Sequence, residues 1–199
     1  MGTNIRKVLL FITDGFSDWE ASYVTAEINK PSTGYCVKTI AIDAEPKTSM
    51  GGLRVLPDYI LPTYVPDADV AMLIIPGGTG WREKQNQQAS ILVDFCFSQA
   101  IPVAAICDAT TFLGRYGFLD QHKHTSNSLA YLQEAAPDYK GEQHYIEAQS
   151  VRDRDVITAN GTAAVEFTKH ILELLQVYKD EQLEEWYTIF KHGLYQGTV

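Results

Sequence analysis

Cys107 is the residue of this chain whose position could make it chemically reactive. A strand-forming run, residues 102–106, leads into the cysteine, and a helix-compatible segment follows at once. The thiol is therefore expected at a sharp turn between strand and helix, where unpaired backbone N–H groups and the helix dipole favour a thiolate. The alternative interpretation is a small buried apolar residue, because free cysteine is among the most buried residue types.

A second candidate segment, Asp14-Gly-Phe-Ser-Asp-Trp-Glu20, leaves a buried run and carries three carboxylates. Ser17 or Asp18 could simply cap the helix that follows, and we favour that interpretation for Asp18. Glu20 lies one turn further and could instead point across the strand ends toward the thiol. A carboxyl group buried beside a thiolate should have a raised pKa and donate a hydrogen bond to the sulfur.

The third candidate segment is the turn Pro76-Gly-Gly-Thr-Gly, which also follows a buried run. Gly77 and Gly78 let the backbone approach a ligand closely. The N–H groups of Gly78 and Asp108 could together form an oxyanion hole for addition to a carbonyl, a nitrile or a similar carbon. Trp81 could form a wall of the same pocket or pack in the core, and Asn160 could line the same cleft.

The arrangement of predicted elements brings these three turns together. Strand-like runs at residues 8–12, 35–42, 69–75, 102–106 and 156–159 alternate with helical patterns, which predicts a mainly parallel sheet covered on both faces. Ligands of such sheets bind at the carboxyl ends of the strands, where all three turns fall. We also expect helices over 19–30, 81–99, 108–116, 128–135, 162–177 and 181–192, a hairpin or meander over 50–58, and a further strand over 144–148.

Four motifs together resemble the DJ-1/PfpI superfamily, which is related to the class I glutamine amidotransferase domain. They are Asp14-Gly-Phe-x-Asp-x-Glu20, Leu73-Ile-Ile-Pro-Gly-Gly78, Ala104-Ala-Ile-Cys107 and Gly161-Thr-Ala-x-x-Glu-Phe. The resemblance spans residues 6 to 178 and implies a flavodoxin-like three-layer α/β sandwich with a nucleophile-elbow cysteine at Cys107. It also implies that Glu20 hydrogen-bonds the thiolate, that Gly78 and Asp108 supply oxyanion donors, and that the protein is a homodimer. We expect a single domain over residues 1–199, with a C-terminal helical extension at about 180–199 that covers the core or a dimer partner.

The chain departs from the family pattern at the position of the catalytic base. Some members place a histidine directly after the cysteine, where this chain has Asp108, and others place one about twenty residues on, where it has Thr125-Ser-Asn127. The His-x-Glu element of amidotransferases is also missing. Asp108 could replace the histidine only if its pKa is raised, and if it faces outward it is simply a helix N-terminal acid. We include Asn127 among the candidate substrate-binding residues.

Composition narrows the classes of partner. The 199 residues carry a formal net charge of −9, which argues against nucleic acid or an anionic membrane as the main partner. No signal peptide or apolar span is visible, so we expect a cytoplasmic protein. Cys36 and Cys96 are interpreted as packing residues of a reduced protein. His122 and His124 form an H-x-H pair without a third ligand in view, so we predict no metal site and no cofactor.

The leading functional hypothesis is a cofactor-independent enzyme in which Cys107 attacks a small carbonyl, amide or isonitrile substrate. Glu20 would tune the thiol, and the amides of Gly78 and Asp108 would hold the developing oxyanion. The alternative is a redox-sensing, stress-response or chaperone protein that acts through oxidation of Cys107.

Overall fold

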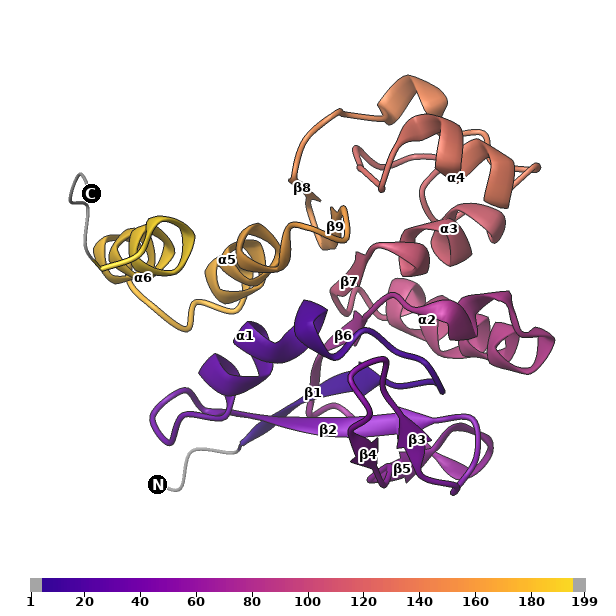
Figure 1. Ribbon diagram of the computed structural model, residues 1–199. Helices are drawn as coiled ribbons and strands as arrows, with labels where there is room; N and C mark the ends of the chain where they lie inside the picture. The colour runs from indigo at the N-terminus through magenta and orange to yellow at the C-terminus, as the bar shows by residue number, and fades with distance from the viewer. Residues whose placement is uncertain (1–4, 195–199) are drawn as a thin grey trace.

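The computed structural model describes residues 5–194 and contains a seven-stranded mixed sheet, with strands in the order β5-β2-β1-β6-β7-β9-β8 (Figure 1). All neighbours pair in parallel except β8 and β9, which form an antiparallel hairpin at one edge. The strands are β1 Arg6–Phe11, β2 Tyr35–Ala41, β5 Tyr59–Ile60, β6 Val70–Ile75, β7 Val103–Ile106, β8 Ser150–Asp153 and β9 Val156–Ala159. The predicted mainly parallel sheet is confirmed.

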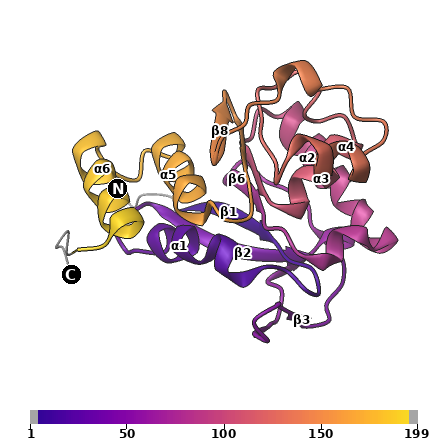
Figure 2. The same cartoon turned by 45° about the horizontal axis from the view of Figure 1, so that its top comes forward.

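Helices cover both faces of the sheet and give the three layers expected from the sequence (Figures 1 and 2). One face carries α1 Asp18–Ile28, α5 Ala164–Leu174 and α6 Asp180–His192. The other carries α2 Ala89–Ser98 and α3 Asp108–Arg115, with α4 Leu129–Ala135 packed outside them. No helix among residues 5–194 is long and apolar enough to cross a membrane.

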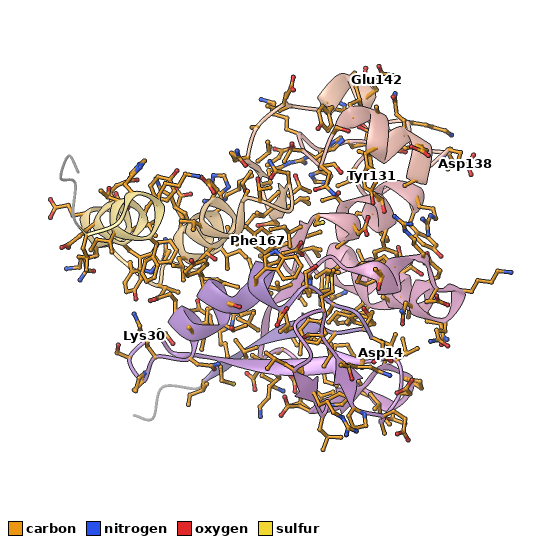
Figure 3. The ribbon with its side chains drawn as sticks, in the orientation of Figure 1. Asp14, Lys30, Tyr131, Asp138, Glu142 and Phe167 are labelled. Carbon is orange, nitrogen blue, oxygen red and sulfur yellow. The ribbon has the colours of Figure 1, made fainter. Side chains whose placement is uncertain are left out.

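Successive side chains of the central strands pack into two separate hydrophobic cores, one on each face of the sheet, because side chains alternate between the faces of a strand. In β1, Val8 and Leu10 pack beneath α1 and α5, whereas Leu9 and Phe11 pack beneath α2 and α3. On the α5 side, Phe167 is fully buried between α5 and α1 (Figure 3). Because β1, β6 and β7 are buried on both faces, the sequence shows them as continuous apolar runs.

The segment before α2 differs from the sequence prediction. A single helix over 81–99 was expected, but α2 begins only at Ala89, after two 3-10 turns at Thr79–Arg82 and Lys84–Gln88. Side-chain amides hold the early turns: Asn86 Nδ2 donates to the Gly80 carbonyl at 2.7 Å and Gln87 Nε2 to the Trp81 carbonyl at 2.9 Å. Such local side-chain bonds compete with regular helix hydrogen bonding.

The predicted strand over 144–148 is also wrong. A 3-10 turn at Glu142–His144 is followed by irregular chain with one isolated bridge between His124 and Tyr145, and the strand lies further on, at Ser150–Asp153. Register with Val156–Ala159 across a tight turn fixes that position. The displaced segment forms a wall of a cavity described below.

The two-stranded hairpin of β3 Lys47–Thr48 and β4 Arg54–Val55 is held by acids of the first turn. Asp14 Oδ1 accepts a hydrogen bond from the Thr48 N–H at 2.9 Å, and Asp18 Oδ1 accepts one from the Gly51 N–H at 3.2 Å. The expectation that Asp18 caps its own helix is therefore wrong, because its carboxylate bonds to the hairpin. Of the three acids in this turn, Glu20 is the one whose side chain binds at the carboxyl ends of the strands, through the Gly77 N–H.

Helix α6 covers the core, as one of the two sequence interpretations stated. Leu183 and Trp186 are buried, and the Trp186 and Phe190 rings lie edge-on to Tyr23 of α1. The expected extension over 180–199 thus has its helix at Asp180–His192, and residues 195–199 lie outside the described chain. A buried polar cluster anchors the start of this extension: Glu27 of α1 accepts hydrogen bonds from both Tyr178 and Lys30.

Replacing Tyr178 by phenylalanine should lower the free energy of unfolding by about 1–2 kcal/mol, because the largely buried Glu27 carboxylate loses one of its two donors. Urea denaturation at pH 7 measures this difference. Tyr116→Phe serves as the control, since the Tyr116 ring is half-exposed and its hydroxyl makes no hydrogen bond among the described residues. Equal losses in both variants would contradict the assignment.

Candidate active site

Cys107 occupies the sharp turn between β7 and α3. Its backbone has φ 59° and ψ −128°, a conformation that is uncommon for a residue with a side chain. The turn is held on both sides: the Cys107 N–H donates to the Ala159 carbonyl at 2.9 Å, and the Thr110 hydroxyl donates to the Cys107 carbonyl at 2.6 Å. The strand-to-helix elbow inferred from the sequence is therefore present. Hydrogen bonds to β9 and from α3 hold Cys107 in its uncommon backbone conformation.

Gly77 brings the second and third turns against this elbow. A Cβ atom placed on Gly77 would lie 2.6 Å from Cys107 Cβ, 2.9 Å from Glu20 Oε2 and 3.0 Å from the Asp108 nitrogen. Glycine is needed here because any side chain would collide with all three groups. Cys107, Glu20 and the start of α3 thus meet around one residue without a side chain, as the convergence of the three turns predicted.

Glu20 is 1% exposed and accepts a hydrogen bond from the Gly77 N–H at 2.6 Å through Oε2. Its other oxygen, Oε1, is buried without a hydrogen-bond partner among the described residues. Burial raises the pKa of Glu20 to about 7, against smaller lowering by the Gly77 N–H and by neighbouring side chains. The sequence-based expectation of a raised pKa agrees with this environment. A carboxyl group with a pKa near 7 can exchange a proton at neutral pH.

The pKa of the Cys107 thiol is raised, although its position at the start of a helix was expected to favour the thiolate. Burial, and then the charge of Glu20, raises the pKa of Cys107 to about 12, while Asn127 and the Asp108 N–H lower it to a smaller extent. Desolvation thus outweighs the first turn of α3. Because the charges of Glu20 and Cys107 oppose each other, the two groups form a coupled pair that holds one negative charge over a wide pH range. The thiolate is favoured when Glu20 carries the proton.

Asn127 and Gly161 close over the sulfur from the opposite side. The Asn127 Nδ2 donates to Cys107 Sγ at 3.4 Å, and its Oδ1 accepts from the Gly161 N–H at 2.9 Å. A Cβ on Gly161 would lie 2.8 Å from Sγ, so only glycine leaves the sulfur uncovered at this position. The sequence placed Asn127 among the substrate-binding residues but did not predict its contact with the thiol.

Two backbone N–H groups at the thiol have no backbone hydrogen-bond acceptor among the described residues. The N–H of Gly78 and that of Asp108 make no backbone hydrogen bond among the described residues, although the flanking Ser17 N–H donates to the Gly77 carbonyl and the Thr79 N–H to the Gly15 carbonyl. Gly78 has φ 125°, and a Cβ there would lie 2.1 Å from the Gly15 carbonyl oxygen. The role of these two N–H groups as oxyanion donors stays a prediction, and their lack of a backbone partner is compatible with it.

The Asp108 side chain is engaged with α4. Its Oδ1 accepts a hydrogen bond from the Tyr131 hydroxyl, which in turn accepts one from Arg82 Nη2 at 3.4 Å. These groups line a cavity of about 260 Å³ whose lining does not include Cys107. This arrangement agrees with the outward-facing alternative for the Asp108 carboxylate. Its backbone N–H remains at the thiol, so the two parts of Asp108 face different surroundings.

Trp81 is a core residue rather than a wall beside the thiol. It is 1% exposed, stacks on Phe112 with 4.5 Å between ring centroids, and donates from Nε1 to the Pro76 carbonyl at 2.8 Å. It contributes to the lining of the smaller cavity next to Asp108. Asn160 lines the cleft as predicted, but its amide donates to Gln149 at 2.9 Å and its Oδ1 accepts from the Thr162 N–H at 3.0 Å.

The imidazoles have other partners. His124 is fully buried, with Nδ1 bonded to the His122 carbonyl at 2.6 Å and Nε2 to the Tyr139 hydroxyl at 2.5 Å. His170 Nδ1 bonds to the Ser150 hydroxyl at 2.8 Å. Within residues 5–194 no histidine makes a hydrogen bond to Cys107, and no group of three His, Cys, Asp or Glu side chains could hold a metal ion. Among the described residues, Glu20 is the carboxyl group whose charge raises the pKa of the thiol.

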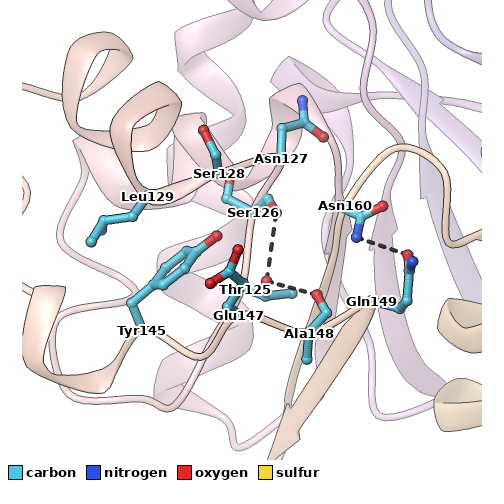
Figure 4. A pocket seen from close by; sticks show the side chains of 10 residues that line it. All are labelled: Thr125, Ser126, Asn127, Ser128, Leu129, Tyr145, Glu147, Ala148, Gln149 and Asn160. Atoms are coloured by element: carbon cyan, nitrogen blue, oxygen red, sulfur yellow. Dashed lines mark hydrogen bonds between the residues drawn. The ribbon is translucent and has the colours of Figure 1, made fainter.

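A cavity of about 670 Å³ opens beside Asn127 (Figure 4). The 125–129 segment forms one side, and the chain from Tyr145 to Gln149 together with Asn160 forms the other. Sequence reasoning missed Tyr145 and Glu147 because it assigned 144–148 to a strand. The positions of Thr125, Ser126 and Ser128 beside Asn127 in the chain were the available signal for this wall.

Comparison with known proteins places this constellation in a family. The model of the DJ-1/PfpI family matches residues 6–174, which include every residue of the site described above. The chain belongs to the DJ-1/PfpI family. Two curated relatives from Bacillus subtilis are each 35% identical to it and are named "Uncharacterized protease YoaZ" and "Uncharacterized protease YdeA". The alignments cover 94% and 96% of this chain and 91% and 94% of the relatives.

Solved structures agree with this assignment. A ThiJ/PfpI family protein from Bacillus anthracis is 37% identical with a TM-score of 0.86, over 96% of this chain and 93% of that one. A DJ-1 superfamily protein from Agrobacterium tumefaciens is 33% identical with a TM-score of 0.84, over 94% and 99%. The DJ-1/PfpI family model ends at residue 174, before α6, whereas these alignments extend over nearly the whole chain.

Proposed function

We propose that this DJ-1/PfpI protein is a cofactor-independent hydrolase in which Cys107 is the nucleophile toward small carbonyl or amide substrates. The observation that supports this most is the buried Glu20 carboxyl, with a pKa of about 7 and an unpartnered oxygen, packed around Gly77 against the cysteine. It supplies a proton acceptor in a site that has no contacting imidazole among the described residues. Two curated relatives bear the name of proteases, which agrees with attack on an amide carbon.

The first chemical step is a proton transfer and an attack. The Cys107 thiol passes its proton to the Glu20 carboxylate, and the thiolate sulfur forms a bond to the substrate carbonyl carbon while the π electrons move to oxygen. The N–H groups of Gly78 and Asp108 point where that oxyanion develops. Glu20 then returns the proton to the departing amine as the carbon–nitrogen bond breaks, leaving a thioester on Cys107.

Water completes the cycle. Glu20, again a carboxylate, accepts a proton from the attacking water, and the tetrahedral intermediate collapses with release of the acid and protonation of the Cys107 sulfur by Glu20. The whole cycle therefore needs only Cys107, Glu20 and one water molecule, and it returns both side chains to their starting protonation states. The same first step without a leaving group describes addition to a reactive aldehyde.

Turnover of a panel of small amides, glyoxals and isonitriles by the wild type and Cys107→Ser tests the proposal. We expect turnover of at least one class by the wild type, lost to background in Cys107→Ser, with mass spectrometry detecting an acyl adduct on Cys107. Equal rates for the two proteins would contradict the enzyme assignment. Stoichiometric oxidation of Cys107 by peroxide in place of turnover would support the redox-sensing alternative.

A further inference from the structure

The larger cavity, beside Asn127, carries one unbalanced charge. Its lining consists of hydroxyl, amide and small apolar side chains with a single carboxylate, Glu147, and it includes no Lys, Arg or His. Within residues 5–194, Glu147 makes no ion pair or hydrogen bond, and the Tyr145 hydroxyl on the same wall has no partner either. Figure 4 shows the carboxylate and this hydroxyl extending into the space between the two walls.

The smaller cavity on the other side of the α3 N-terminus is different. It is lined by two arginines and two carboxylates, so its formal charges balance, and Arg82 bonds to Tyr131, which bonds to Asp108. Arg115 also bonds to Gln87 at 3.1 Å and to the Ala135 carbonyl at 3.1 Å. Of these two cavities, only the larger one therefore carries an unbalanced formal charge.

The larger cavity adjoins the thiol through Asn127. Asn127 lines it and also donates to Cys107 Sγ at 3.4 Å, while Asn160 of the lining directly precedes Gly161, which lies over the sulfur. A small molecule whose reactive carbon is at Cys107 can thus extend past Asn127 toward Glu147. The net charge of −9 adds a long-range attraction for cations.

We propose that Glu147 binds the cationic end of the substrate, so that the molecules processed at Cys107 carry an ammonium group a few atoms from the electrophilic carbon. Glu147 would pair with the charge, and the Tyr145 hydroxyl would accept one of the ammonium hydrogens. The statement about substrates rests on the proposed function. The preference of the cavity for cations does not, and it can be measured without any turnover.

The test uses a matched pair of thiol reagents, aminoethyl and sulfonatoethyl methanethiosulfonate. In each, the Cys107 thiolate attacks the sulfenyl sulfur, a mixed disulfide forms and methanesulfinate leaves. Mass spectrometry follows the rate at Cys107 separately from Cys36 and Cys96. The ratio of the cationic to the anionic rate should fall about fivefold in Glu147→Gln, as expected for removing one charge near a partly hydrated partner. In Glu147→Lys it should fall further, below one.

Glu142→Gln is the matched control, because it removes the same charge from an exposed residue of the preceding turn that does not line the cavity (Figure 3). It should keep the wild-type ratio. An unchanged ratio in Glu147→Gln, or an equal fall in Glu142→Gln, would overturn the inference. If turnover depends on Cys107 while the ratio is unchanged, only this inference fails. If the ratio falls but no substrate is turned over, only the proposed function fails.

Discussion

Glu20→Gln should make the protein more stable at pH 8, by about 3 kcal/mol in the free energy of unfolding. Burial raises the pKa of Glu20 to about 7 from an ordinary value of 4.5, and each unit of difference is worth about 1.4 kcal/mol. Below pH 4.5 the carboxyl is protonated in both the folded and the unfolded protein, and its folded environment carries no electrostatic cost. As pH rises through 7, the folded protein must hold a buried carboxylate, and stability is lost.

The measurement is urea denaturation of both proteins between pH 4 and 8. The difference between Glu20→Gln and the wild type should be small at pH 4, grow between pH 4.5 and 7, and remain constant above pH 7. A difference that does not change with pH would contradict the assignment of the proton to Glu20.

Glu27→Gln provides a control of opposite sign on the same helix. Burial acts to raise the pKa of Glu27, but hydrogen bonds from Lys30 and Tyr178 outweigh it and lower the pKa overall. The stability that Glu27 contributes is therefore present above its ordinary pKa and is lost as pH falls through its lowered value. Glu27→Gln should destabilise the protein at neutral pH, whereas Glu20→Gln stabilises it.

The same Glu20 variant should increase the reactivity of the thiol. After burial, the charge of Glu20 is the largest cause that raises the pKa of Cys107. Glu20→Gln removes that charge, so the thiolate should form at lower pH and alkylation of Cys107 by iodoacetamide at pH 8 should be faster than in the wild type. An equal or slower rate in Glu20→Gln would contradict this effect of the Glu20 charge.

The positions of the site residues were predictable from the sequence because strong local patterns mark them. A buried parallel strand reads as a continuous apolar run, and the residue after it must lie at the carboxyl edge of the sheet. Cys107 and Gly77 follow such a run within two residues and Glu20 follows one within eight, so their convergence needed only the order of strands.

The charge states were harder to predict because they depend on packing. The first turn of α3 was expected to favour a thiolate, but the depth of burial of Cys107 is set by Asn127 and Gly161, which come from distant loops. The direction of the Asp108 carboxylate depends in the same way on Tyr131 of α4. Contacts between residues far apart in the chain leave no periodic signal in the sequence.

The chain over 144–148 shows why one wall of the cavity was missed. His144, Tyr145 and Ile146 have the alternation and bulk of a strand, yet the sheet edge is already paired by Ser150–Asp153. Tyr145 instead bridges to His124, and its ring lies edge-on to that imidazole. Tertiary pairing therefore overrides a local strand preference at this position.

Gly161→Ala should close the thiol without unfolding the protein. The added Cβ would lie 2.8 Å from Cys107 Sγ and 3.2 Å from Cys107 Cβ, and neither atom can move far because the elbow is held by β9 and by Thr110. We expect a loss of about 1–2 kcal/mol in stability from overpacking. Turnover should fall about 100-fold, since a displacement of about 1 Å at a reacting atom has that effect.

Gly51→Ala is the matched control for this substitution. The three atoms nearest its Cβ would all belong to the Asp18 carboxylate, with Oδ2 closest at 2.3 Å, at an exposed hairpin where the carboxylate can turn away. Alkylation of Cys107 by iodoacetamide at pH 8 should match the wild type in Gly51→Ala and fall at least about tenfold in Gly161→Ala. A wild-type rate in Gly161→Ala would mean that reagents reach the sulfur from the Glu20 side, and that the cavity beside Asn127 is not the route to Cys107.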